Sequence, residues 1–373
     1  MTSRERILKV LSGETPDRVV FAPNIWQWFE YQKRHGLPGE LEGCGTQLDV
    51  LQMLGVDIFS RNLLTDISER LFGGHVREEW PSLEVERTVE GDLTRRIYHT
   101  PRGDLSEVLW FDQDGTTLVQ KEYLFKDFDR EYPAWKAWFE ARELVFDPVS
   151  FHELESRVGD SGLVIAGEIT NPLKQLHILA RQDNAIYLLF DHEPEMMELM
   201  DIYAEKALVL IRQMLDCGVR VVMCMDNLDS FFYPPEHFER YCAPFFRRAS
   251  ELCHERGAWL FSHACGRQKQ IISHVVDCGL DGLEGIAFPP LGDIQLWEAK
   301  AAGKRFIVEG GLSASQLEGE VTQAQADEHV RSLFEKMRPF DRFIFSMSCN
   351  TSIAAKWDTL KRYRDAWLKY GRL

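Results

Sequence analysis

Long hydrophobic runs and an excess of basic residues are both missing from this sequence of 373 residues. No apolar stretch approaches the ~18 residues of a membrane-spanning helix, so we expect no membrane insertion. The chain carries 43 Lys and Arg against 59 Asp and Glu, a net charge of −16. A surface this acidic disfavours nucleic acid or an anionic membrane as the main partner.

Closely spaced cysteines and a targeting signal are missing too. The eight cysteines are scattered along the chain, which argues against the compact disulfide framework of a small secreted domain. Residues 1–11 instead predict an amphipathic helix, with Thr2 and Glu5 at capping-box spacing. We therefore expect a cytoplasmic protein whose cysteines are reduced thiols, most of them buried.

What the sequence does contain is an alternation of helical patterns and short apolar runs. Four of the runs follow a helical pattern that ends in glycine, at Gly218, Gly257, Gly279 and Gly303. Apolar strands alternating with helices predict a parallel sheet, and eight of them predict an α/β fold of the (β/α)8 TIM-barrel type. An open doubly wound sheet is the alternative, but no strand is followed by a glycine-rich dinucleotide fingerprint. The predicted strands are 19–25, 56–60, 163–167, 219–225, 258–263, 282–288, 305–309 and 343–349.

The interval between the second and third predicted strands is too long for one helix. Residues 73–127 alternate polar and apolar side chains, and turn sequences interrupt them at Glu90-Gly91-Asp92, Pro101-Arg102-Gly103 and Asp114-Gly115. We predict an antiparallel β insertion over roughly 64–150 that decorates the barrel and is a candidate to cover its mouth. The whole chain, 1–373, is then expected to form a single decorated barrel domain.

In such a barrel the active site lies at the carboxyl ends of the strands. His263 and Cys265 are two residues apart on one predicted strand, so both should face the barrel mouth, with Cys349 opposite them. Two thiolates and an imidazole suit Zn²⁺ and leave a fourth position open, although cysteines also pack in barrel cores. Glu284 or Glu309 is a candidate for the fourth ligand, for a general base, or for a group that orients His263.

Four further stretches of the chain are distinctive: Arg4-Glu5-Arg6-Ile7-Leu8 with Pro16-Asp17-Arg18, Tyr98-His99-Thr100-Pro101-Arg102-Gly103, Ser262-His263-Ala264-Cys265-Gly266, and the course from Gly279 through Gly310-Gly311 to Cys349. Through them the chain resembles the uroporphyrinogen decarboxylase superfamily along nearly its whole length. The resemblance implies a decorated (β/α)8 barrel.

Two departures disfavour decarboxylation of uroporphyrinogen itself. Decarboxylases of this superfamily carry an arginine-rich segment after the first strand, where this chain has Trp26-Gln27-Trp28-Phe29-Glu30-Tyr31. They also place an essential aspartate after an Ile-Phe-Ser run, whereas Ile58-Phe59-Ser60 is followed here by Arg61. The entrance therefore lacks the counter-charges that a highly anionic tetrapyrrole needs.

The chain is more similar to the superfamily's corrinoid-linked methyltransferases. His263, Cys265 and Cys349 fall on that branch's zinc-ligand positions. The resemblance implies zinc-dependent methyl transfer between a small methylated substrate and the cobalt of a corrinoid (cobalamin) carried by a partner protein. We favour an aryl methyl ether and O-demethylation. The alternatives are a methylcorrinoid to thiol methyltransferase, a decarboxylase, and a non-catalytic barrel that binds a tetrapyrrole.

Aromatic residues flank the predicted mouth around Trp26 and around Phe231. They suit stacking on a methoxylated ring or caging of a quaternary ammonium, unless they pack in the core. Acidic residues at strand ends suit catalysis or substrate orientation, or they only satisfy loop backbone. The predicted substrate-binding residues are Asn24, Trp26, Arg61, Asn227 and Phe231, and the predicted catalytic residues are Glu168, Asp226 and Glu309.

Overall fold

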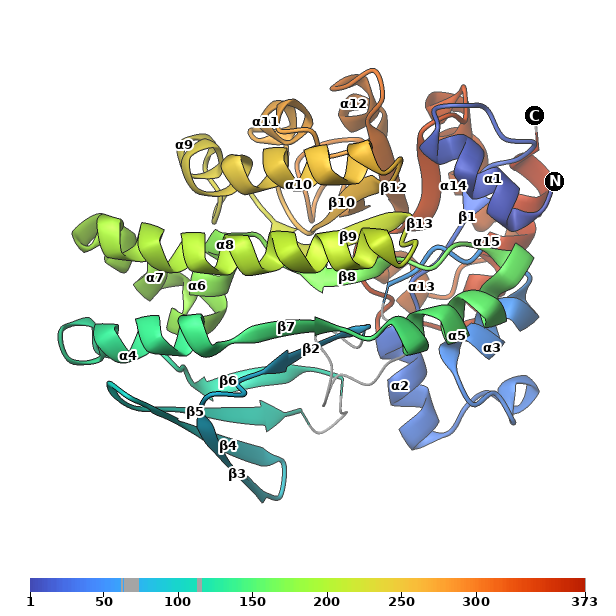
Figure 1. Ribbon diagram of the computed structural model, residues 1–373. Helices are drawn as coiled ribbons and strands as arrows, with labels where there is room; N and C mark the ends of the chain where they lie inside the picture. The colour runs from blue at the N-terminus through green and yellow to red at the C-terminus, as the bar shows by residue number, and fades with distance from the viewer. Residues whose placement is uncertain (62, 64–73, 113–115, 373) are drawn as a thin grey trace.

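A parallel β-sheet forms the centre of the molecule (Figure 1). The computed structural model describes residues 1–61, 63, 74–112 and 116–372, apart from the side chain of Glu168. Seven strands of the described chain pair in the order β1-β13-β12-β11-β10-β9-β8, and every pair is parallel. They are β1 (Val20–Phe21), β8 (Ala166–Ile169), β9 (Val221–Leu228), β10 (Trp259–Ala264), β11 (Gly282–Ile286), β12 (Ile307–Leu312) and β13 (Phe343–Met347).

The remaining predicted strand, 56–60, lies between β1 and β8, the two edge strands of this sheet. The amide of Asp57 donates to Phe21 O of β1 at 2.9 Å. On the other side, Ile58 N donates to Ser161 O and Leu163 N donates to Ile58 O, both at 2.9 Å. A Cβ on Gly162 would lie 2.0 Å from Ile58 O, so only glycine allows this approach. The segment forms one isolated bridge rather than a named strand, and it links β1 to β8 as the predicted barrel requires.

Helices surround the sheet, and several of them begin or end at the capping residues and glycines that the sequence predicts. Helix α1 begins after Thr2, which forms a capping box with Glu5. Gly218, Gly257 and Gly279 have the positive φ angles typical of residues that end a helix. Gly303 is needed for a different reason: a Cβ at this position would lie 2.9 Å from Phe306 Cβ, which is too close. No helix in the described ranges has the length and apolar character needed to cross a membrane. The helices of the barrel are α1 (Ser3–Leu11), α2 (Trp26–His35), α3 (Gln47–Leu54), α5 (Pro148–Val158), α6 (Pro172–Ala180), α7 (Gln182–Asp191), α8 (Glu193–Asp216), α9 (Pro235–His237), α10 (Ala243–Glu255), α11 (Ile272–Asp277), α12 (Leu296–Ala301), α13 (Ala314–Glu318), α14 (Gln323–Met337) and α15 (Trp357–Tyr370).

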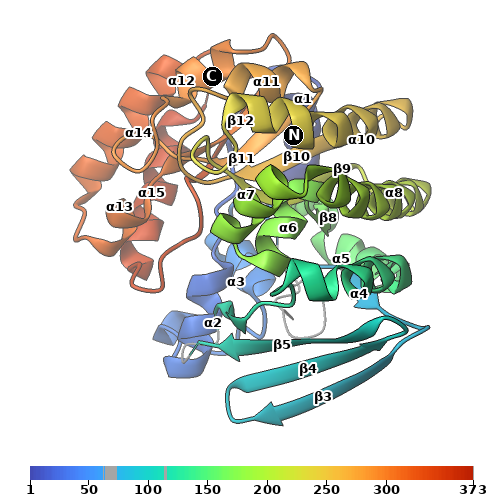
Figure 2. The same cartoon turned by 90° about the vertical axis from the view of Figure 1, so that its left-hand side faces the viewer.

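The predicted antiparallel insertion is present and projects from one side of the barrel (Figure 2). Its turns at Gly91 and at Pro101-Arg102-Gly103 connect paired strands as predicted, while Asp114-Gly115 lies outside the described residues. One helix of the insertion contacts both its sheet and α8 of the barrel. The elements are β2 (Val76–Glu79) paired with β7 (Glu143–Phe146), the sheet β3 (Glu84–Glu90), β4 (Leu93–Thr100), β5 (Gly103–Phe111) and β6 (Leu118–Glu122), and helix α4 (Phe128–Ala141).

The barrel interior is a compact apolar cluster that sets the direction of the site residues. Val221 and Met223 of β9 and Phe261 of β10 belong to it, so alternate residues of these strands point inward. Ile7 of α1 joins the same cluster, which places α1 across one end of the barrel. His263 follows Phe261 by two residues and therefore continues the inward-facing row toward the opposite, carboxyl end.

Candidate functional site

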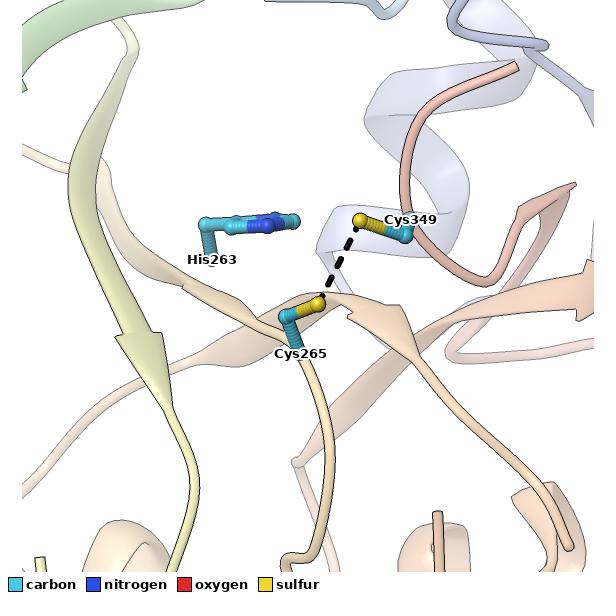
Figure 3. A group of neighbouring side chains, drawn as sticks. All are labelled: His263, Cys265 and Cys349. Atoms are coloured by element: carbon cyan, nitrogen blue, oxygen red, sulfur yellow. Dashed lines mark hydrogen bonds between the residues drawn. The ribbon is translucent and has the colours of Figure 1, made fainter. Parts of the chain in front are cut away.

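Three side chains that could bind a metal converge at the carboxyl end of the barrel (Figure 3). His263 ends the inward row of β10, Cys265 follows that strand, and Cys349 follows β13. The two sulfur atoms lie 3.4 Å apart. One ligand atom from each of the three residues lies within 4.8 Å of the others. The structure thus brings together all three of the ligands that the sequence predicts.

The imidazole of His263 is held by a carboxylate rather than free to rotate. Glu284 of β11 contacts its Nδ1, and Arg61 donates from Nε to both carboxylate oxygens of Glu284, at 3.3 and 3.2 Å. All three side chains are buried. Because Nδ1 faces Glu284, Nε2 is the nitrogen left to face the sulfurs. Glu284 therefore occupies the orienting position, one of the three roles that the sequence left open for it.

The three candidate ligands and Glu284 shift one another's pKa values. Burial is the largest influence on His263 and would lower its pKa, but the charge of Glu284 together with the hydrogen bonds to Cys349 and Glu284 raises that pKa. A hydrogen bond from Cys265, with a further one from His263 and the charge of Arg61, lowers the pKa of Cys349 to about 4 despite burial. The same hydrogen bond raises the pKa of Cys265. One thiolate is thus already favoured near neutral pH, and thiolates are the form that binds metals.

The donor set fits zinc. Two sulfurs bound to one tetrahedral Zn²⁺ at about 2.3 Å lie about 3.8 Å apart, close to the separation observed here. Two thiolates and a neutral imidazole also balance the charge of a divalent ion and leave one tetrahedral position for another ligand. A carboxylate on the distal nitrogen of a histidine ligand is the usual support of such sites.

Two of the predicted substrate-binding residues anchor the loop that carries Cys349. Arg61 Nη2 donates to Asn350 Oδ1 at 2.6 Å, and Asn24 Nδ2 approaches the same oxygen at 3.4 Å. Thr351 donates from both its amide and its hydroxyl to the carbonyl of Asn24. Asn24 therefore ties the end of β13 to β1, and Arg61 ties it to the segment 56–60. Arg61 also lines a cavity at this end of the barrel.

A cavity of about 980 Å³ opens beside the three candidate metal ligands, His263, Cys265 and Cys349. The barrel contributes Trp26, Asn227 and Lys174 to its wall. Much of the remaining wall comes from the insertion, which supplies an aromatic and apolar surface. The insertion residues on that surface are Trp80, Val85, Tyr98, Leu109, Leu118 and Trp138, with the charged residues Glu78, Glu79, Arg96, Glu107 and Arg142 beside them. We refer to Trp80, Tyr98 and Trp138 as the aromatic wall. None of these three residues was predicted from the sequence to line the site.

The predicted aromatic residues have different positions. Trp26 lines the cavity. Phe231 is 66% exposed, lies 5.0 Å from the guanidinium of Arg267, and is not part of the cavity wall. Its neighbour Tyr233 is buried and donates to the backbone carbonyl of Asp226. Trp28 is buried against Trp357 with its ring 5.6 Å away, which is core packing.

Two of the predicted catalytic carboxylates, those of Asp226 and Glu309, are not part of the cavity wall. Asp226 is buried and accepts from Asn171 N at 2.6 Å and from Ser262 Oγ at 2.7 Å; burial raises its pKa to about 6. Glu309 of β12 is also buried, and burial together with the charge of Glu284 raises its pKa well above the usual value. The side chain of Glu168 lies outside the described part of the chain.

Comparison with known proteins shows the family of the chain and solved structures with a similar fold. The model of the family described as "Uroporphyrinogen decarboxylase (URO-D)" matches residues 154–370. A methyltransferase from Methanosarcina mazei superposes with a TM-score of 0.64 at 14% identity, covering 99% of each chain. A D-psicose 3-epimerase from Clostridium cellulolyticum gives a TM-score of only 0.35 at 10% identity, over 60% of this chain and 83% of that one. No curated protein sequence matches.

Proposed function

Since the chain belongs to the uroporphyrinogen decarboxylase family, we propose that it is a zinc-dependent methyltransferase. It moves a methyl group between a small methylated substrate and the cobalt of a corrinoid carried by a separate protein. The observation that supports this most directly is the group of His263, Cys265 and Cys349, whose ligand atoms lie within 4.8 Å of one another beside a cavity of about 980 Å³. The fold shared with a methyltransferase agrees with it.

Arg61 argues against decarboxylation of a uroporphyrinogen-like substrate. This guanidinium stands where the family's decarboxylases carry an aspartate, and it is paired with Glu284 and Asn350. Its charge is therefore already compensated, and no carboxylate takes the place of the aspartate at that position. The segment after β1 brings Trp26 into the cavity wall in place of arginine.

The residues of this site have separable tasks in the proposed reaction. When bound, zinc supplies a Lewis acid that stabilises negative charge on the heteroatom losing its methyl group, an effect worth several kcal/mol. Glu284 fixes the tautomer and the orientation of His263, and Arg61 holds Glu284 in place. The insertion supplies much of the cavity wall, and a wall that limits the access of water strengthens electrostatic stabilisation inside such a site.

The cavity wall favours an aryl methyl ether as the methylated substrate. Trp26 and the aromatic wall present large ring surfaces near the candidate zinc site, and such surfaces pack well against another aromatic ring. The protein would then act as the O-demethylating component of a two-protein system.

The test combines metal analysis with methyl transfer. Purified wild-type protein should hold about one zinc per chain. With a corrinoid protein in its reduced Co(I) form, it should convert 3,4-dimethoxybenzoate or its alcohol to the phenol while methyl-cobalt appears in the absorption spectrum. Cys265→Ala should lose both zinc and activity, while Cys44→Ala, a half-buried thiol remote in sequence from the site, should keep both. Wild-type protein without zinc, or a Cys265→Ala variant with full activity, would contradict the proposal.

A further inference from the structure

Lys174 contributes a cationic side chain to the cavity wall. It lies in the first turn of α6, and its side chain lines the same cavity as His263 and Cys265. Among the side chains that the structure describes, none accepts a hydrogen bond or forms an ion pair with its ammonium group; only its backbone amide is bonded, to Asn171 Oδ1 at 3.0 Å.

The other cationic side chains of the cavity wall are neutralised by carboxylates. Arg61 pairs with Glu284 at 3.2 Å, Arg96 pairs with Glu107 at 3.5 Å, and Arg142 pairs with Glu78. The remaining acidic residue of the wall, Glu79, lies 3.7 Å from Arg77. After these pairs cancel, the described wall retains the positive charge of Lys174. A divalent zinc with two thiolates and a neutral imidazole adds no net charge.

An uncompensated ammonium in a half-enclosed cavity is costly unless a ligand supplies the opposite charge. Burial lowers the pKa of Lys174, while the charges of Asp226 and Cys265 act in the opposite direction. No ion pair joins Asp226 to Lys174 among the described side chains; the Asp226 carboxylate oxygens accept from Asn171 N and Ser262 Oγ, and its charge acts on Lys174 from a distance. Asn227, also in the wall, adds a neutral amide that can hydrogen-bond a polar ligand.

We propose that Lys174 binds a carboxylate group on the substrate, so that the protein selects carboxylated aryl methyl ethers over neutral ones. The aryl ring then lies between Lys174 and the aromatic wall. The methyl ether part of this inference rests on the proposed function, whereas the selection of an anionic ligand does not.

The test measures binding, without methyl transfer. Isothermal titration calorimetry compares 3,4-dimethoxybenzoate with its neutral counterpart, 3,4-dimethoxybenzyl alcohol, on the wild-type protein and three variants. Wild-type protein should bind the carboxylate at least tenfold more tightly than the alcohol. Lys174→Met should lose that preference while binding the alcohol within about twofold of wild type, and Lys174→Arg should restore most of it. Lys269→Met, which removes an exposed lysine outside the cavity, should leave both affinities unchanged.

Every outcome of the titrations either supports or overturns the binding of a substrate carboxylate by Lys174. Equal binding of the two ligands by wild-type protein, equal losses for both in Lys174→Met, or no binding of either ligand overturns it. Selective binding of the carboxylate that depends on Lys174, in a protein that transfers no methyl group from it, supports the inference and contradicts the proposed function.

Discussion

The sulfur atoms of Cys265 and Cys349 lie 3.4 Å apart although 84 residues separate them in the chain. The parallel sheet produces this proximity, because the carboxyl ends of β10 and β13 open onto the same mouth of the barrel. Nothing in the packing of the core requires two thiols to meet there, since both side chains are only partly buried. A metal ion bound by both sulfurs, as in the proposed function, would explain why the two thiols lie so close together.

Removing the charge that orients His263 should weaken metal binding. Glu284→Gln keeps the size of the side chain and an oxygen that can accept from Nδ1, but it loses the carboxylate charge and the ion pair with Arg61. Loss of such a supporting group costs about 10–100-fold in zinc affinity. Competition with a chromogenic chelator measures it. Glu251→Gln, at an exposed position of α10, is the matched control; an unchanged affinity in Glu284→Gln would show that the contact does not support the site.

Asp226 should make the protein less stable as the pH rises. Its pKa in the folded protein is raised to about 6, above the value of 3.8 expected without burial. The native state therefore keeps this proton to higher pH than the unfolded chain, and stability falls between about pH 4 and pH 6 by up to about 3 kcal/mol. Asp226→Asn should remove this loss and so gain stability relative to wild type at pH 7.5 but not at pH 4.

Urea unfolding of both proteins across this pH range checks the prediction. The asparagine can still accept from Asn171 N and donate to Ser262 Oγ, so the comparison keeps the hydrogen bonds. Parallel pH profiles for the two proteins would contradict it.

The closure of the barrel should depend on Gly162. A Cβ at this position would lie 2.0 Å from the carbonyl oxygen of Ile58, so Gly162→Ala must displace the segment that joins β1 to β8. We expect a loss of about 2–4 kcal/mol in the free energy of unfolding. Gly39→Ala is the control, since a Cβ there meets no atom within 4 Å. Equal stability of the two variants in urea unfolding would show that the close approach is absent.

The aromatic wall should affect substrate binding without affecting the metal. Trp80→Ala removes a large ring from the cavity, and we expect the KM for an aryl methyl ether to rise about tenfold, as for the loss of a ring contact worth about 1.4 kcal/mol. Its zinc content should equal that of wild type. Trp110→Ala, in β5 of the same insertion but outside the cavity wall, should leave KM unchanged. A loss of zinc in Trp80→Ala, or an equal KM effect in both variants, would contradict this role.

The barrel and the proximity of the three candidate metal ligands could be predicted because local rules determine them. Strand periodicity directs His263 and Cys265 to one side, and the position of Cys349 at a strand end directs it to the same mouth. The alternation of apolar strands and glycine-ended helices gave the parallel sheet. The extent of the single domain over 1–373 and the roles of the site residues stay predictions.

The far wall of the cavity could not be predicted, because it depends on how the insertion packs against the barrel. Trp80 and Trp138 have no sequence pattern that separates them from core tryptophans, and only tertiary packing brings them opposite His263. The sequence also leaves open whether the aromatic residues near the mouth contact a substrate or pack in the core, and the ring of Trp28 packs against Trp357. The same limit applies to Lys174, because only the folded wall shows that none of the described side chains forms an ion pair with it.

Zinc-edge X-ray absorption spectroscopy of the purified protein tests the central claim most directly. If His263, Cys265 and Cys349 bind zinc together, the spectrum should show two sulfur neighbours at about 2.3 Å and nitrogen or oxygen neighbours at about 2.0–2.1 Å, with close to one metal per chain. Cys349→Ser should lower the number of sulfur neighbours from two to one. Zinc surrounded only by nitrogen and oxygen, or protein that binds no zinc, would contradict the account.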